Sequence, residues 1–181
     1  MTRAQARQPG FSALGIPLDL APMEAKLVSE LPKDAGWQYE PKWDGFRCLA
    51  FRAGDEVEIR AKSGKSLSRF FPEVLGNLRA LPVKNFVLDG ELVIPVKGGL
   101  SFDALQMRLH PAASRITRLS AETPATLIVF DCLLRKSGEP LLAKPFEERR
   151  AALEAFSKAS ANIRGWRSRP IPANSARPRN G

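Results

Sequence analysis

The stretch YEPKWDGFRCLAF, residues 39–51, sets a lysine two residues before an Asp-Gly pair and five before an arginine, with apolar side chains around them. A lysine amine in water is protonated at neutral pH and reacts poorly, whereas burial or a neighbouring cation frees it for covalent chemistry. We expect Trp43 and Phe46 to provide such surroundings for Lys42. The forked donors of Arg47 suit a phosphate or a ribose. A plain β-hairpin with both cations in solvent would explain the same residues.

A second Asp-Gly pair lies in VLDGELVI, residues 87–94. Asp89 and Glu91 are two residues apart, so they share one face of a strand. Two carboxylates framed by Val, Leu and Ile are costly to bury without a cation, and Mg²⁺ favours carboxylate and phosphate oxygens. We therefore predict Asp89 and Glu91 as metal ligands. The alternative is a turn that faces solvent.

A third acid lies in LIVFDCLL, residues 127–134, where Asp131 follows Phe130. An aromatic residue at this place can be ordinary core, or it can offer its ring as a stacking surface. The residues themselves leave both interpretations of Phe130 open.

The elements that must position these residues are strands and helices in mixed order, typical of an α+β fold. Asp44-Gly45 predicts a hairpin between the first two strands, Pro72 suits the first turn of a helix, and Ser101 suits a helix N-cap. The strand at 125–134 is apolar throughout, so we expect it to be buried on both faces. We predict strands at 37–42, 46–53, 56–62, 85–96 and 125–134, and helices at 70–81, 101–109 and 145–156.

Composition defines the boundaries of the folded part. Residues 1–20 mix Pro, Gly and Arg and are interpreted as a leader, and residues 157–181 form a basic Pro/Arg/Ser tail that we expect to be disordered. The net charge is +9, but the six cations after Glu154, where no acid follows, leave only +3 for residues 1–157. A basic tail indicates a shaped nucleic-acid groove less strongly than a basic face does.

The two cysteines and the length of the apolar runs indicate in which cellular compartment the protein lies. Cys48 and Cys132 each lie in an apolar run, so we expect buried, reduced thiols and a cytoplasmic protein without a membrane partner. No apolar run approaches the roughly 20 residues that a bilayer crossing needs. A zinc site is disfavoured, since His110 is the only histidine.

The order of four motifs is more specific than any one of them. EPKWDGFR, AKSGK, VLDGELVI and LIVFDCLL follow one another along residues 40–134. This series resembles the ATP-dependent DNA ligases of the covalent nucleotidyltransferase superfamily, over about residues 20–156, and is most similar to the bacterial ligases of end-joining repair. The resemblance implies an ATP-grasp-like adenylation domain, with antiparallel sheets flanking a nucleotide cleft, that acts in DNA repair and recombination.

In such ligases the motif lysine attacks the α-phosphate of ATP, pyrophosphate leaves, and the lysine-bound AMP passes to the 5′-phosphate of a DNA nick. The 3′-hydroxyl then displaces AMP. The resemblance implies ATP and Mg²⁺ (or Mn²⁺) as cofactors, and nicked double-stranded DNA and end-joining proteins as partners. By position Lys42 would be the nucleophile, and the binding residues would be Glu40 and Phe130 at the adenine, Arg47 and Lys62 at ribose or phosphates, and Glu91 at ribose or metal.

The chain departs from the family pattern at several places. Lys62 and Ser63 stand where many ligases have Arg and Asn. Beyond Phe156 we find neither the Glu-Gly-hydrophobic-hydrophobic-x-Lys strand nor the Lys-x-Lys motif, and no OB-fold domain follows. We therefore expect a partial adenylation domain at 21–156, truncated or frameshifted near 155–160, with weak or no catalysis. The alternatives are a catalytically dead ATP- and nucleic-acid-binding remnant, or an RNA ligase or capping-type nucleotidyltransferase.

Overall fold

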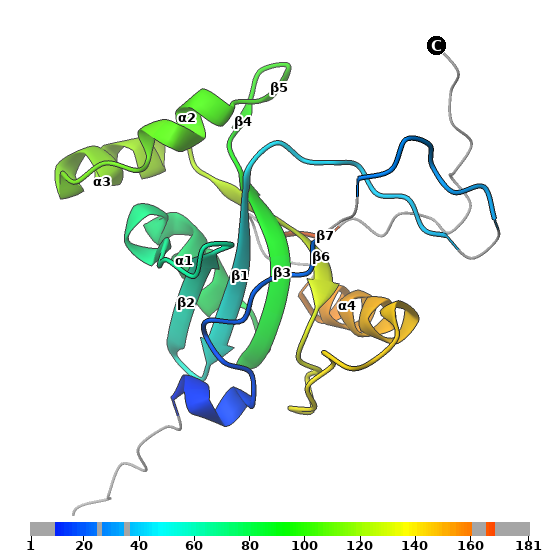
Figure 1. Ribbon diagram of the computed structural model, residues 1–181. Coiled ribbons are helices and arrows are strands. Elements are labelled where there is room, and N and C mark those ends of the chain that lie inside the picture. The colour runs from blue at the N-terminus through cyan, green and yellow to red at the C-terminus, as the bar shows by residue number, and fades with distance from the viewer. Residues whose placement is uncertain (1–9, 25–26, 35–36, 161–165, 169–181) are drawn as a thin grey trace, which may run out of the picture.

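The computed structural model describes residues 10–24, 27–34, 37–160 and 166–168, and centres on one sheet with strand order β2-β1-β3-β6-β7 (Figure 1). Neighbouring strands are antiparallel, except that β7 runs parallel to β6. The predicted α+β class with an antiparallel sheet is confirmed. The strands of this sheet are β1 (Phe46–Ala53), β2 (Glu56–Ala61), β3 (Asn85–Val93), β6 (Thr126–Cys132) and β7 (Trp166–Ser168).

Helices connect these strands, and their ends follow the expected local rules. Pro72 is the first residue of its helix, and the Ser101 side chain accepts a hydrogen bond from the backbone N–H of Ala104, as an N-cap does. The helix α3 and the small hairpin β4–β5 were not predicted. The remaining elements are η1 (Phe11–Leu14), η2 (Ser68–Phe70), α1 (Pro72–Ala80), β4 (Pro95–Val96), β5 (Gly99–Leu100), α2 (Phe102–Met107), α3 (Ala113–Glu122) and α4 (Phe146–Ser160).

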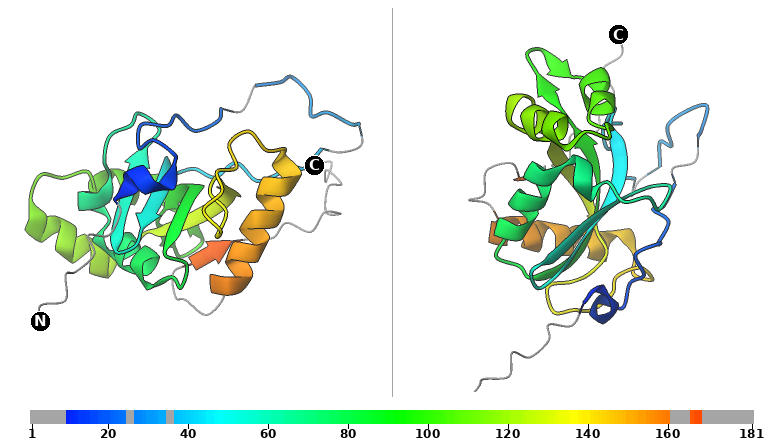
Figure 2. Two further views of the ribbon diagram at one scale, coloured as in Figure 1. Left: turned by 90° about the horizontal axis from the view of Figure 1, so that it is seen from below. Right: turned by 90° about the vertical axis from the view of Figure 1, so that its left-hand side faces the viewer.

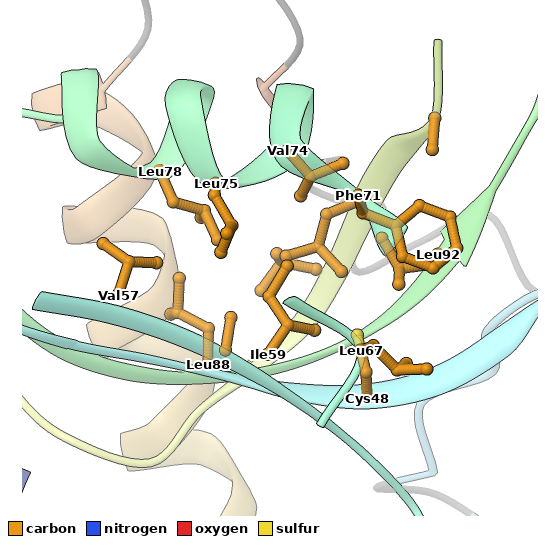
Figure 3. Close-up of a cluster of buried hydrophobic side chains, with 14 of the residues drawn as sticks. Cys48, Val57, Ile59, Leu67, Phe71, Val74, Leu75, Leu78, Leu88 and Leu92 are labelled. Atoms are coloured by element: carbon orange, nitrogen blue, oxygen red, sulfur yellow. The ribbon is translucent and has the colours of Figure 1, made fainter. Parts of the chain in front are cut away.

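The main hydrophobic core lies between one face of the sheet and the helices α1, α2 and α4. Alternate residues of β1 and β3, such as Cys48 and Leu88, meet Val74 and Leu78 of α1 across this layer (Figure 3). These side chains are nearly or fully inaccessible to solvent, so each buried leucine or valine among them contributes about 1.5–3 kcal/mol to the free energy of unfolding. This packing holds β1, β3 and β6 as a rigid base for the opposite face.

The opposite face of the sheet is covered in part by residues that precede residue 21. Leu14 and Ile16 are buried in a second cluster with Leu49, Phe51 and Val87. The predicted boundary of the leader at residue 20 is therefore wrong for residues 11–20. Apolar side chains exposed on β1 and β3 need a cover, and this short segment supplies it.

Residues 37–44 form no helix or strand, so the predicted strand at 37–42 is not observed. The expected hairpin at Asp44-Gly45 is therefore wrong. Both edges of β1 are already paired, with β2 on one side and β3 on the other, so no free edge remains for a preceding strand. Residues 37–44 belong instead to a long loop that leads into the start of β1 and projects from the sheet (Figure 2).

The predicted disordered tail also differs from the structure where the structure describes it. The helix α4 extends to Ser160, which is buried, and β7 pairs in parallel with residues 127–129 of β6. The helix serves as the crossover between two parallel strands, which needs a dozen or more residues. The rest of the predicted tail, residues 161–165 and 169–181, lies outside the described residues.

Candidate active site

The site lies on the second face of the sheet, where β1 and β3 carry charged residues beyond the apolar cluster. In the register of the two strands Arg47 lies opposite Glu91, and Leu49 opposite Asp89. Arg47 donates from Nε to one oxygen of Asp89 at 2.6 Å and from Nη2 to the other at 2.8 Å. Burial raises the pKa of Asp89, and the hydrogen bonds and charge of Arg47 oppose that rise. Asp89, which we predicted as a metal ligand, thus uses both oxygens on Arg47.

A β-bulge places the aromatic ring of the site. Asp89 lies opposite Asp131 and Gly90 opposite Val129, so Phe130 is the extra residue on β6. Its ring turns to the charged face, with its centroid 4.3 Å from the guanidinium carbon of Arg47. Phe130 is half-buried, so the prediction that this strand is buried on both faces is wrong at this point.

Close contact between β3 and β6 depends on the second Asp-Gly pair. A Cβ atom added to Gly90 would lie 2.5 Å from the carbonyl oxygen of Ile128, closer than real contacts allow. Gly45 has the same property, with 2.2 Å to the carbonyl oxygen of Leu92. Both glycines of the quoted motifs therefore let strands approach, and neither forms the turn that Asp-Gly often marks.

The helix α4 adds two buried arginines at the end of β6 that β7 does not cover. Arg149 Nε donates to both oxygens of Asp131, at 3.0 and 2.9 Å. Arg150 Nη1 lies 3.1 Å from Glu40 Oε1 and donates to the carbonyl oxygen of Phe130 at 3.4 Å. Burial raises the pKa of both Asp131 and Glu40, and the charges of their arginines oppose it. These ion pairs tie α4 to the sheet and to the loop.

Lys42 lies in the loop, two residues after Glu40. It is exposed, so the burial expected from Trp43 and Phe46 is not observed. Its charge lowers the pKa of Glu91, which places the amine in the electrostatic neighbourhood of β3. Among the described residues Lys42 makes no hydrogen bond or ion pair, so its amine is available to a ligand.

Glu91 is the carboxylate of the site that has no hydrogen-bond or ion-pair partner in the described part of the chain. It is half-buried, and burial raises its pKa, while Arg47 and Lys42 act in the opposite direction. No group of three or more His, Cys, Asp or Glu side chains there could hold a metal unaided. One free carboxylate still fits Mg²⁺, which commonly binds one or two protein carboxylates together with phosphate oxygens.

Lys62 joins the site from the end of β2. Its backbone N–H donates to the carbonyl oxygen of Arg47 at 3.1 Å, and its amine lies 2.8 Å from Glu24 in the loop. Beside it a cavity of about 680 Å³ opens, with a largely apolar wall. The cavity is lined by Gly45, Phe46, Arg47, Ala61, Lys62, Ser63, Lys65, Ser66, Leu67, Phe70 and Leu109.

The structure therefore brings together Glu40, Lys42, Arg47, Asp89, Glu91 and Phe130, with Lys62 at the margin. Sequence reasoning missed Arg149 and Arg150. A signal was present, because Arg149 lies four and seven residues before Leu153 and Phe156, which lie on the core side of α4. A charged residue in line with a buried helical stripe needs a buried partner.

Comparison with known proteins shows the family to which the chain belongs. The profile of a family described as ATP dependent DNA ligase domain matches residues 22–171, most of the chain. The chain belongs to the ATP-dependent DNA ligase domain family. The resemblance that the four motifs indicate is thereby confirmed.

Individual relatives of this ligase domain support the assignment. DNA ligase C of Mycobacterium tuberculosis is 47% identical over 134 residues, which cover 74% of this chain and 37% of that protein. DNA ligase of Methanothermobacter thermautotrophicus is 32% identical over 167 residues, covering 86% of this chain and 29% of that protein. The chain thus spans between 29% and 37% of the length of these relatives.

Solved structures agree with the fold. The ligase domain of M. tuberculosis LigD matches with a TM-score of 0.54 and 28% identity, over 67% of this chain and 37% of that chain. A mycobacterial DNA ligase D complexed with ATP and MES matches with a TM-score of 0.50 and 29% identity, over the same shares of the two chains. Within the described residues of this ligase domain, no helix has the length and apolarity that a bilayer crossing demands.

Proposed function

We propose that this ligase domain binds ATP and carries out the first step of DNA ligation, the adenylylation of its own Lys42. The observation that carries the proposal is the amine of Lys42, which is exposed, has no partner among the described residues and acts electrostatically on Glu91, in the position of the family's Lys-x-Asp-Gly-x-Arg motif. Arg47 and Phe130 lie together on the same face of the sheet as Glu91. Lys42 Nζ, after losing a proton to solvent, attacks the α-phosphorus of ATP. A P–N bond forms, the bond to the bridging oxygen breaks, and pyrophosphate leaves.

The roles of the other residues follow from their surroundings. The exposed side of the Phe130 ring would stack on adenine, with Glu40 at the edge of the base. Arg47, half-exposed and held by Asp89 through Nε and Nη2, would turn its Nη1 amino group to the ribose or the phosphates. Lys62 is exposed at 57% and, among the described residues, pairs with an exposed glutamate; it would exchange that partner for a phosphate.

Mg²⁺ fits this donor set through Glu91. A bound Mg²⁺ would offset the negative charge that gathers on the phosphates during the attack. Asp89, the second predicted metal ligand, would act through Arg47, since that guanidinium uses both of its oxygens.

We extend the proposal to the two later steps of ligation. The AMP would pass from Lys42 to the 5′-phosphate of nicked double-stranded DNA, and the 3′-hydroxyl would seal the nick, in cytoplasmic DNA repair together with end-joining proteins. What supports this is the family membership and the similarity to ligases C and D.

Transfer of label from α-labelled ATP to the protein tests the first step. The purified chain is incubated with ATP and Mg²⁺, denatured, and counted, beside Lys42→Ala and the matched control Lys33→Ala, a loop lysine paired with Glu30 on the surface. We expect label on the parent chain and on Lys33→Ala, and none on Lys42→Ala. Circular dichroism shows that each variant is folded.

The other outcomes separate the alternatives. Label from GTP but not from ATP would favour a capping-type enzyme. A folded chain that takes no label, yet is protected by ATP from thermal unfolding, would be a binding remnant that has lost its chemistry.

A further inference from the structure

The loop that carries Lys42 has few attachments to the rest of the molecule. Between described residues, no backbone hydrogen bond involves residues 37–44. Apolar side chains of the loop are largely in solvent, with Leu27 exposed at 96% and Trp37 at 58%. Among the described residues of the loop, Trp43 is half-buried beside Lys42, but no strand pairs with the loop. Side-chain contacts, not sheet pairing, therefore set where Lys42 lies.

Three such contacts reach the described body of the domain. Two of them lie some twenty residues from Lys42: the exposed pair of Glu24 with Lys62, and a long hydrogen bond of 3.4 Å from Arg47 Nη2 to the carbonyl oxygen of Met23. The third joins Glu40 to Arg150 at 3.1 Å, only two residues from Lys42. It is also the best shielded, with the two side chains exposed at 27% and 9%. A shielded ion pair is screened less by salt than an exposed one.

Arg150 is a rigid anchor for this contact. It lies in the helix α4, whose neighbouring Arg149 is paired with buried Asp131 of β6. Its Nη1 also donates to the Phe130 carbonyl oxygen, beyond the part of β6 that β7 covers. Among the described residues, Arg150 Nη2 is buried with no hydrogen-bond partner, and Glu40 is the one carboxylate that pairs with Arg150.

We propose that Arg150 is a positioning residue for Lys42: by binding Glu40 it ties the loop to α4 and holds the amine beside Glu91 and Arg47. This inference rests on the proposed function for its consequence in catalysis. Fixing a nucleophile near its target replaces a search through loop conformations by a single geometry, and a displacement of about 1 Å can cost roughly 100-fold in rate.

A measurement that does not depend on catalytic activity tests whether Arg150 holds the loop in place. The full chain is labelled with 5-fluorotryptophan at Trp43 alone, the other two tryptophans being replaced by phenylalanine in every variant. Arg150→Gln is compared with Arg135→Gln, which removes an arginine paired at 3.5 Å with Glu148 on the exposed side of α4. We expect Arg150→Gln to narrow the ¹⁹F line of Trp43, Arg135→Gln to leave it unchanged, and Arg150→Lys to restore most of its width.

The same variants are then compared in the labelling reaction with ATP. We expect Arg150→Gln to slow the formation of protein-bound AMP by 10- to 100-fold, with the KM for ATP changed less than threefold. Equal ¹⁹F line widths in Arg150→Gln and Arg135→Gln would overturn the inference. A parent chain that takes no label refutes the proposed function alone, because the line widths still decide whether Arg150 holds the loop.

Discussion

Replacing Arg149 by methionine should destabilise the domain by leaving a buried acid without its cation. Asp131 is exposed at 5%, and both of its oxygens accept from Arg149 Nε. In Arg149→Met the carboxylate would keep only its hydrogen bond from the backbone N–H of Cys132, at 2.8 Å. Methionine retains most of the apolar volume of the arginine side chain, so the substitution mainly removes its charge and its hydrogen bonds.

The expected cost is about 3–5 kcal/mol of unfolding free energy, the usual price of removing one partner of a buried ion pair. For a domain of this size that lowers the unfolding midpoint by roughly 10 °C. The cost also depends on pH. Burial already raises the pKa of Asp131 while Arg149 opposes it, so loss of Arg149 raises that pKa further.

The sign of the pH effect follows from proton linkage. A carboxylate whose pKa is higher in the folded than in the unfolded chain binds protons more tightly when folded. The deficit of Arg149→Met is therefore complete above the folded pKa of Asp131. It shrinks as the pH falls through that value and is gone below the pKa that Asp131 has in the folded parent, which burial raises above the ordinary value.

Urea denaturation at pH 7 and at pH 5 measures this deficit directly. The double variant Arg149→Met/Asp131→Asn should regain most of the loss, since no charge is then buried, and Arg135→Met reports an exposed arginine on the same part of the fold. A deficit below about 1 kcal/mol, or one that is the same at both pH values, would refute the buried-charge argument.

Three further predictions concern other sites. Gly90→Ala should lose about 1–3 kcal/mol in urea denaturation, because its Cβ would meet the Ile128 carbonyl oxygen at 2.5 Å, whereas Gly76→Ala, in an open helical position, should gain up to about 1 kcal/mol. Glu91→Gln should melt above the parent at pH 7, since burial raises the pKa of Glu91, and the difference should vanish below pH 4.5. Burial raises the pKa of Cys132 to about 11, so a thiol reagent at pH 8 should modify it only after unfolding.

The sequence was sufficient for the parts of the site that depend on strand periodicity and local motifs. Arg47 and Glu91 converge because they lie opposite each other on neighbouring strands whose alternation is evident in the residues. The Ser101 cap and the Pro72 helix start are likewise local rules, each obeyed over a few residues.

The missed parts depend on contacts between distant segments. Whether 37–42 pairs as a strand depends on which edges of β1 are free, and β3 takes one of them from forty residues away. The bulge at Phe130 arises from the register of β3 against β6, to which no single residue type points. The spacing of Arg149 from Leu153 and Phe156 indicates that it is buried, but the partners of Arg149 and Arg150 are known only once α4 is docked on β6.

The charged residues of the candidate site differ in whether they have a partner among the described residues. The buried acids Asp89 and Asp131 each have an arginine that uses both oxygens. Glu91, which is half-buried, and Lys42, which is exposed, have no partner among the described residues. For Glu91 an unpaired, half-buried charge lowers stability. We propose that Glu91 and Lys42 are left for charges that arrive from outside, such as those of a metal-bound nucleotide phosphate.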